Sequence, residues 1–255
     1  MLFDVISIFP ELFPPYFNES LLKRAQAAGL LEFRVHNLRD YSEDRHQKVD
    51  DRPYGGGPGM ILRADIVIRC LQAVSVQRLA VRSRRLNPKP STLNARVIAL
   101  DPAGKQLTQS MAKRLAKYDQ LVLLCGRYEG FDERVYKFVD EKISIGPYVL
   151  AGGELPALVL IDTVSRMIPG VVGDPESIVD ETHSAEGYVE YPQYTRPEAF
   201  SVQGLAVSPL TPPKNLNAKR STLNPLRVPK VLLSGNHKKI TEWRKKHSRM
   251  TKQDK

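Results

Sequence analysis

The chain has 255 residues, 42% of them hydrophobic and 26% charged, which indicates one or two soluble globular domains. Its two cysteines exclude a disulfide scaffold and favour a reducing compartment, and no hydrophobic run approaches the roughly 18 residues of a membrane span. The net charge of +10 favours a polyanionic partner, and nucleic acid is the first candidate.

Strand and helix patterns alternate from the N-terminus onward. Residues 1–10 predict a buried strand; because they include Asp4 and no basic stretch, they do not resemble a signal peptide, and a cytoplasmic protein is expected. The helical spacing of Leu22 and Ala25 predicts a helix over 19–28 that ends at Gly29. The later patterns predict strands over 31–35, 96–100 and 121–125 and helices over 64–74, 106–117 and 156–168.

This alternation predicts an α/β fold, in which a parallel sheet is covered by helices on both faces. Ligands of such sheets bind at the carboxyl ends of the strands. Glycine-rich loops at 125–134 and 144–156 fall at that edge, and a third occupies 50–60. One such loop alone is more often a tight structural turn, but three in one chain suggest a site built mostly from backbone groups.

The loops lack the glycine spacing of dinucleotide and P-loop sites, and the cysteines and histidines lack metal-ligand spacing. The polar residues that remain are a few carboxylates and arginines: Glu129, Glu154, Asp180, Glu181, Arg127 and Arg166. This inventory fits a neutral or cationic heterocyclic cofactor held by the main chain, and removal of one proton by a carboxylate. Two structural alternatives stay open, because Glu154 could cap its helix and Arg166 could form a local ion pair.

The second half of the chain has a different organisation. Residues 170–195 are polar and acidic and predict a linker. A small C-terminal unit follows and ends in a basic helix over 238–247, which either is a solvated face or suits a phosphate backbone.

Two segments repeat almost unchanged. Residues 75–81 recur at 201–207, and residues 91–94 recur at 221–224, with Pro, Asn, Lys and Arg between them. Because this composition cannot bury a core, we interpret the segments near 75–95 and 201–226 as a related element inserted twice into surface loops. The alternative is an added RNA-binding arm.

Five motifs resemble the bacterial tRNA (guanine-N1)-methyltransferases of the SPOUT superfamily: residues 44–60, 125–134, 144–156, 191–197 and 231–237. The resemblance implies a SPOUT methyltransferase domain over 1–169, whose parallel sheet contains a deep trefoil knot. An interdomain linker over 170–195 and a small, mainly helical, tRNA-binding domain over 196–255 would follow. It also implies a homodimer with active sites at the subunit interface.

The resemblance further implies S-adenosylmethionine as cofactor, held among the knot loops. The cofactor residues by position are Leu100, Gly126, Glu129, Ile145, Gly146, Pro147, Tyr148, Val149, Leu150, Gly152 and Gly153. Glu129 would lie near the methyl group and could assist a Mg²⁺ ion. The substrate would be the guanosine immediately 3′ of the tRNA anticodon, preceded by another guanosine. Its flipped base would be walled by the 50–59 loop, through Asp50, Arg52, Gly57 and Gly59.

The chemistry requires a base that removes the proton from guanine N1 and a cation near O6. Arg166 suits the second role because its charge is permanent. The family's base is an aspartate in an acidic-Asp-Ser sequence, where this chain has Asp180-Glu181-Thr182. The register leaves both carboxylates open, with Glu181 favoured. The family's Ser-Pro-Gln-Gly turn is here 101–104, Asp-Pro-Ala-Gly, so the side-chain contacts of that turn are also open.

Two rival functions are weighed against this one. The first is a SPOUT methyltransferase that acts on a ribose 2′-hydroxyl or on ribosomal RNA, which the product nucleoside would distinguish. The second is a non-catalytic RNA-binding module that keeps the fold, which would bind the cofactor without turnover.

Overall fold

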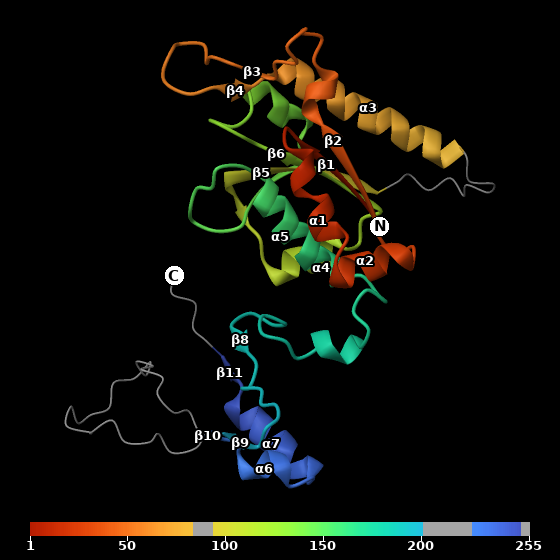
Figure 1. Ribbon diagram of the computed structural model, residues 1–255. Coiled ribbons are helices and arrows are strands. Elements are labelled where there is room, and N and C mark those ends of the chain that lie inside the picture. The colour runs from red at the N-terminus through yellow and green to blue at the C-terminus, as the bar shows by residue number, and fades with distance from the viewer. Residues whose placement is uncertain (84–93, 201–225, 251–255) are drawn as a thin grey trace. The chain divides into compact units, whose positions relative to one another are not determined.

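The computed structural model describes residues 1–83, 94–200 and 226–250 (Figure 1). The chain forms two compact units, Met1–Ser177 and Ile178–Lys255. The change between them falls inside the segment 170–195, which contains the short helix η4 (Pro175–Ile178) and strand β8 (Tyr188–Val189). Among the described residues no helix is long and apolar enough to cross a membrane.

A five-stranded sheet forms the centre of the first unit. Its strands are β1 (Leu2–Ser7), β2 (Glu32–Asn37), β5 (Ala95–Gln106), β6 (Gln120–Cys125) and β7 (Glu141–Ser144). They pair in the order β2-β1-β6-β5-β7, and every pairing is parallel, which confirms the predicted sheet. All six residues of β6 are buried, as expected for a central strand that is covered on both faces.

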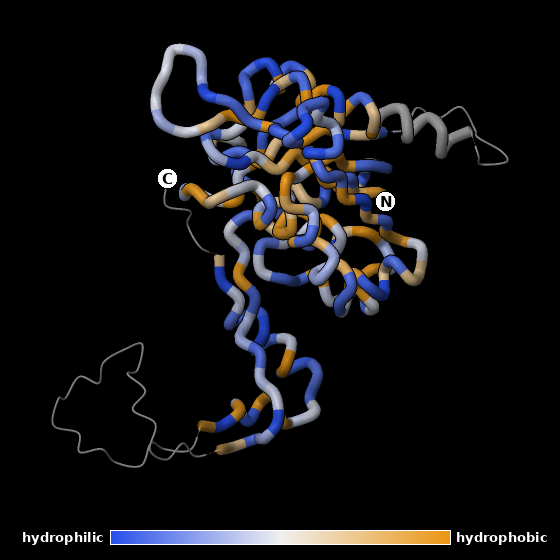
Figure 2. The backbone as a smooth tube through the Cα atoms, turned by 45° about the horizontal axis from the view of Figure 1, so that its top comes forward, coloured by the Kyte–Doolittle hydropathy of each residue, from blue (hydrophilic) through white to orange (hydrophobic). Residues whose placement is uncertain are grey.

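Helices cover both faces of this sheet (Figure 1). The helical elements are η1 (Pro10–Leu12), α1 (Pro14–Phe17), α2 (Ser20–Ala27), η2 (Leu38–Tyr41), α3 (Ala64–Ser83), α4 (Gln109–Leu115), η3 (Glu133–Phe138) and α5 (Glu154–Ser165). Phe3 and Val5 of β1 pack in one hydrophobic core with α1, α2, α4 and α5. Ile6 packs in the other core with η2, α3 and η3. Figure 2 shows many hydrophobic positions in the interior of this unit.

Several predicted boundaries were wrong. The helix predicted over 64–74 is longer, because α3 continues to Ser83 and so enters the segment interpreted as the first insert. Residues 84–93 of that insert lie outside the described residues. The helix predicted over 106–117 is shorter, because the Thr108 side chain accepts a hydrogen bond from the Met111 N–H and starts α4 at Gln109. The helix predicted over 156–168 begins earlier, at Glu154, and ends at Ser165.

The 50–60 loop is the tip of a hairpin. Its arms are β3 (Asp50–Asp51) and β4 (Ile61–Leu62), which pair in antiparallel fashion. Gly55, Gly56, Gly57 and Gly59 all have positive φ, between 78° and 111°. Side chains other than glycine rarely adopt this conformation, which explains the glycine content of the loop.

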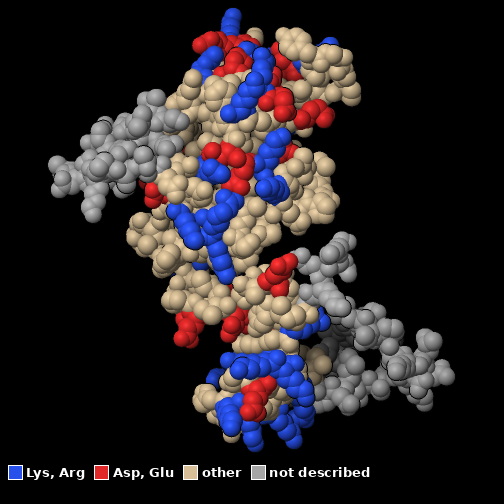
Figure 3. All heavy atoms as spheres, turned by 180° about the vertical axis from the view of Figure 1, so that it is seen from behind, with Lys and Arg blue, Asp and Glu red and all other residues tan. Residues whose placement is uncertain are grey.

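The described part of the second unit contains two helices and short strand pairs. Its elements are β8, β9 (Ala199–Phe200), β10 (Leu226–Arg227), α6 (Lys230–Leu233), α7 (His237–His247) and β11 (Arg249–Met250). The predicted basic helix is confirmed as α7, and Figure 3 shows Lys and Arg side chains gathered over this unit. Leu226 pairs with Phe200, so the described residues on either side of 201–225 form an antiparallel pair. Residues 201–225 themselves lie outside the described residues.

Cys70, on the sheet-facing side of α3, should make the stability of the fold decrease with rising pH in the alkaline range. Its thiol is fully buried, and burial raises its pKa from 9.0 to about 12. The thiol of the unfolded chain therefore ionises first, so the free energy of unfolding should decrease as the pH rises from 9 toward 12. Urea unfolding across this range should give a shallower pH dependence for Cys70→Ala than for the wild type. Equal slopes would contradict the prediction.

Candidate functional site

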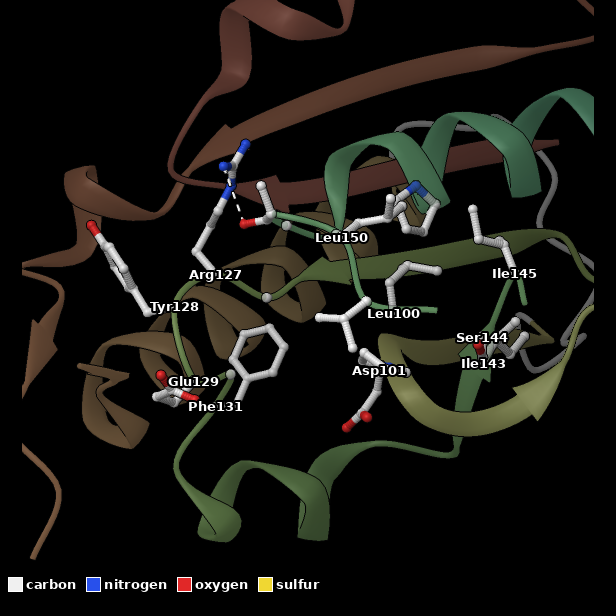
Figure 4. A pocket seen from close by; sticks show the side chains of 18 of the residues that line it. Leu100, Asp101, Arg127, Tyr128, Glu129, Phe131, Ile143, Ser144, Ile145 and Leu150 are labelled. Atoms are coloured by element: carbon white, nitrogen blue, oxygen red, sulfur yellow. Dashed lines mark hydrogen bonds between the residues drawn. The ribbon is translucent and has the colours of Figure 1, made fainter. Parts of the chain in front are cut away.

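A cavity of about 250 Å³ lies at the carboxyl ends of β6 and β7, beside the middle of β5. This volume is close to the lower end of the range for small-molecule sites, roughly 300–1,000 Å³. The walls come from residues 101–104 of β5, called the β5 turn below, with neighbouring residues of β5, η3 and β7, and from the glycine-rich loops at 125–134 and 144–156. The lining residues are Leu100, Asp101, Pro102, Gly126, Arg127, Tyr128, Glu129, Gly130, Phe131, Tyr136, Ile143, Ser144, Ile145, Tyr148, Val149, Leu150, Ala151, Gly152, Gly153 and Pro156. In Figure 4 the Leu100 and Phe131 side chains point into the common space, and Glu129 lies at its edge.

Two of the loops touch each other through their backbones. The Gly153 N–H donates a 2.8 Å hydrogen bond to the Gly126 carbonyl, and Arg127 forms an antiparallel bridge with Gly152. A Cβ atom on Gly153 would lie 2.7 Å from the Cα atom of Cys125 and 2.8 Å from the Gly126 nitrogen. The close approach that shapes this wall therefore requires glycine at 153.

The β5 turn, residues 101–104, interrupts the pairing of β5 with β7. The predicted strand over 96–100 does not end there: β5 pairs with β7 through Leu100, skips residues 101–104 and resumes when Lys105 pairs with Ile143. A Cβ atom on Gly104 would lie 2.6 Å from the Ile143 nitrogen, so glycine lets the strand return to its partner. The skipped residues bring Asp101 and Pro102 into the cavity wall.

The side-chain contacts of this turn, left open by the sequence, centre on Asp101. Its carboxylate accepts hydrogen bonds from the Ala103 N–H at 2.8 Å and from the Tyr136 hydroxyl at 2.6 Å. The Lys142 ammonium lies 3.7 Å from the same carboxylate and 3.6 Å from the centroid of the Tyr136 ring. The Tyr136 ring in turn meets the edge of Phe131, 6.2 Å away, so the network supports an apolar wall of the cavity.

Glu154 joins three segments at the start of α5. It is the first residue of the helix and is 2% exposed. One carboxylate oxygen accepts a 2.7 Å hydrogen bond from the Ser7 hydroxyl, and the other accepts a 2.9 Å bond from Arg127 Nε. The Arg127 guanidinium also lies 4.6 Å from the centroid of the Phe9 ring. The carboxylate therefore bridges β1 to the loop after β6, in addition to its favourable place at a helix N-terminus.

The hairpin loop meets the cavity at Glu129. The Glu129 N–H donates to the Met60 carbonyl at 3.0 Å, and a Cβ atom on Gly59 would lie 2.5 Å from Glu129 Oε1. Of the predicted substrate residues, Gly59 is thus beside the cavity. Asp50 lies in β3, and Arg52 and Gly57 are exposed along the loop.

The structure brings together most of the predicted cofactor residues. Nine of them line the cavity: Leu100, Gly126, Glu129, Ile145, Tyr148, Val149, Leu150, Gly152 and Gly153. Gly146 and Pro147 belong to the same loop but are not among the lining residues. Sequence reasoning missed Phe131 and Tyr136 as wall residues. Their only local signal is that Phe131 directly follows Gly130 and that Tyr136 comes five residues later.

The predicted catalytic residues lie elsewhere in the chain. Arg166 is the C-cap of α5 and follows Pro156, the helix residue that lines the cavity, by ten positions, about 15 Å along the axis. Asp180 and Glu181 belong to the second unit. The cavity therefore lies away from the predicted cation, Arg166 of the same unit, and the predicted base belongs to the second unit. Within the described ranges no group of three or more His, Cys, Asp or Glu residues could hold a metal ion.

Comparison with known proteins places this geometry in context. The family model described as tRNA (Guanine-1)-methyltransferase TrmD matches residues 1–212. A protein of Thermomicrobium roseum named tRNA (guanine-N(1)-)-methyltransferase is 45% identical over 246 residues, which cover 96% of this chain and 78% of that protein. Proteins of the same name from Ruminiclostridium cellulolyticum and Clostridioides difficile are 46% and 42% identical. The matches cover 97% and 99% of this chain and 91% and 95% of those proteins.

Proposed function

The chain belongs to the tRNA (guanine-1)-methyltransferase family, and from this premise we propose that it methylates N1 of the guanosine immediately 3′ of the tRNA anticodon. S-adenosylmethionine would be the cofactor and would supply an electrophilic methyl group on its sulfonium. The observation that supports the proposal most strongly is the cavity, where nine residues expected to hold this cofactor come together from three separate segments.

The residues present fit this cofactor. The apolar side chains that Ile145, Val149 and Leu150 contribute to the wall suit an adenine ring and a ribose, which need flat apolar contact. Gly152 and Gly153 let this loop pack closely against the 125–127 loop, because a Cβ atom at 152 would meet the Arg127 side chain and one at 153 the backbone of Cys125 and Gly126. The Glu129 carboxylate at the edge suits a cationic group, and a Mg²⁺ ion beside it is part of the proposal.

The hairpin loop at 50–59 would form the wall that receives the guanine. The target base must leave its stack to reach the methyl donor, and a glycine-rich loop allows close approach to a planar ring. Contact between Gly59 and Glu129 puts this loop beside the cofactor cavity, which is the juxtaposition that the transfer requires.

Proton removal from N1 would be the task of Glu181 or Asp180, and Arg166 would stabilise the negative charge that develops on O6. Because Arg166 lies at the far end of α5 from its own cavity, we propose that a second copy of the chain supplies it. The active site would then lie at the interface of a homodimer.

The outer side of α5 supports such a dimer. Leu155 and Val159, one turn apart, are 62% and 43% exposed on a mostly apolar helix. Leu12 and Tyr16 are exposed nearby, and the Tyr16 hydroxyl bonds to Asp162 of the same helix. Exposed apolar side chains on one side of a helix, beside further exposed apolar residues, are typical of an interface.

The remaining parts of the proposal concern architecture. Residues 1–169 would form the SPOUT methyltransferase domain, with the knot formed by the loops around the cavity. Residues 170–195 would be the linker, and residues 196–255 the tRNA-binding domain, for which the basic helix α7 is the main support.

Methyl transfer from labelled S-adenosylmethionine to a tRNA transcript tests the proposal. The transcript carries two guanosines across the 3′ end of the anticodon, and the product is digested and identified by mass. We expect 1-methylguanosine at the second guanosine, and activity that falls with a chelator if Mg²⁺ takes part. A 2′-O-methylated product, or activity only on ribosomal RNA, would overturn the specificity. Cofactor binding without turnover on any RNA would overturn the enzyme itself.

A further inference from the structure

The second unit contains an open hollow of about 830 Å³ that the proposed chemistry does not use. It lies between the segment 191–198 and helices α6 and α7. Its lining residues are Tyr191, Pro192, Gln193, Tyr194, Thr195, Arg196, Pro197, Glu198, Val228, Leu232, Leu233, Ile240, Trp243 and Arg244.

Aromatic rings in fixed contact form the walls of this hollow. The Trp243 ring stacks on the His247 ring, with their centroids 4.0 Å apart. The Tyr194 ring meets the Trp243 ring with 6.2 Å between the centroids and 63° between the ring planes. The Arg244 guanidinium lies 4.9 Å from the centroid of the Tyr191 ring. These contacts hold the rings in place, so the wall is built before any ligand arrives.

The apolar groups of the hollow stay partly open. Tyr194 and Leu233 are 48% and 47% exposed, and no residue of α6 or α7 is buried. Exposed aromatic and aliphatic surface of this kind marks a binding site.

Charge identifies the class of ligand. Helix α7 carries a single acidic residue, Glu242, against five lysines and arginines: Lys238, Lys239, Arg244, Lys245 and Lys246. Arg196 lines the hollow itself. Figure 3 shows the basic side chains of this unit surrounding a small acidic patch. Aromatic rings surrounded by cations are the pattern that binds single-stranded nucleic acid, because bases stack on the rings while phosphates meet the cations.

We propose that this hollow binds one unstacked nucleobase of the tRNA against Trp243 and Tyr194, while α7 contacts the neighbouring phosphates. The inference rests on the proposed function for its ligand, since tRNA is the substrate that the family implies. It adds a second contact for a base, separate from the cavity at which methyl transfer would occur.

Trp243 is the only tryptophan of the chain, so its fluorescence reports directly on the hollow. Titration of the full-length protein with tRNA transcript should quench this emission saturably, because a stacked base quenches an indole ring. Inorganic polyphosphate serves as control: it should compete for α7 but leave the emission unchanged, since it has no base. S-adenosylmethionine alone should also leave it unchanged.

Substitutions separate stacking from charge. Trp243→Leu should weaken tRNA binding about tenfold or more, whereas Trp243→Phe should retain most of the affinity because it keeps a ring for stacking. Turnover at saturating tRNA and the affinity for S-adenosylmethionine should both stay unchanged. The double variant of Lys245→Ala and Lys246→Ala should lower the salt dependence of tRNA binding, and Lys23→Ala on α2 is the matched control that should not.

Three outcomes of the titration would overturn the inference: no quenching by tRNA, the same quenching by polyphosphate, or an emission maximum that shifts with protein concentration, which would show that a second copy covers the hollow. Failure of the proposed function is distinguishable from these. Wild-type protein that quenches with tRNA but makes no 1-methylguanosine would retain the base contact and overturn the reaction. Unchanged tRNA affinity in Trp243→Leu, with normal methylation, would overturn the base contact and retain the reaction.

Discussion

Replacing Gly153 by alanine is expected to abolish cofactor binding, with an increase in the dissociation constant of about a hundredfold or more. The added Cβ atom would lie 2.7 Å from the Cα atom of Cys125 and 2.8 Å from the Gly126 nitrogen. Both are backbone atoms of a buried strand end and cannot rotate away. The 151–153 loop must therefore separate from the 125–127 loop and lose the hydrogen bond from the Gly153 N–H to Gly126.

Gly173→Ala is the matched control for this variant. Gly173 belongs to the same unit, has no positive φ, and a Cβ atom there would meet nothing within 4 Å. Calorimetric titration with S-adenosylmethionine should give wild-type affinity for Gly173→Ala and no measurable binding for Gly153→Ala. A Gly153→Ala protein that binds the cofactor normally would show that the contact between the two loops does not shape the site.

The central sheet was predictable because its strands carry their signal locally. The segment 121–125 is a continuous apolar run, and a strand buried on both faces needs such a run. The strand β7 was not predicted: three of its four residues, Glu141, Lys142 and Ser144, are polar, and it is held by pairing with β5. Only long-range pairing identifies it.

The β5 turn shows the same limit in more detail. Pro102 and Gly104 are typical of a strand that has ended, and the local pattern predicts no return. The strand resumes because Lys105 and Gln106 find partners in β7, some 40 residues later in the chain. The contacts of Asp101 with Tyr136 and of Arg127 with Glu154 likewise join residues that are 35 and 27 positions apart. The glycine loops could be located from the sequence, but their mutual contacts could not.

For the candidate site, too, the local motifs were predictable and the long-range contacts were not. Backbone-lined positions follow from glycine-rich motifs, and nine of the predicted cofactor residues do line one cavity. Arg166, Asp180 and Glu181 were assigned through resemblance, and no local pattern says which cavity they serve. For Arg166 the length of α5 gives a specific reason to look to another subunit.

The carboxylate proposed to remove the N1 proton should be identified by Glu181→Gln and Asp180→Asn. Loss of a general base lowers kcat by about 10²–10⁴, and we expect this loss in one of the two variants, with Glu181→Gln favoured. The affinity for S-adenosylmethionine should be unchanged in both. Glu186→Gln, an exposed carboxylate in the same segment, is the matched control. Near-normal turnover in both variants would remove the carboxylate base.

The subunit that supplies the base can be determined by mixing two inactive proteins, Gly153→Ala and the inactive carboxylate variant. Suppose that each cavity uses a base from the second copy. A mixed dimer then has one site that combines the defective cavity with the defective base, and one site in which both the cavity and the base are intact. Half of the dimers in an equal mixture are mixed, so about a quarter of wild-type activity should return. If each chain serves its own cavity, every site of a mixed dimer carries one defect and no activity returns. Restored activity would require both the dimer and the shared site, whereas its absence, with exchange of subunits verified, would assign cavity and base to one chain.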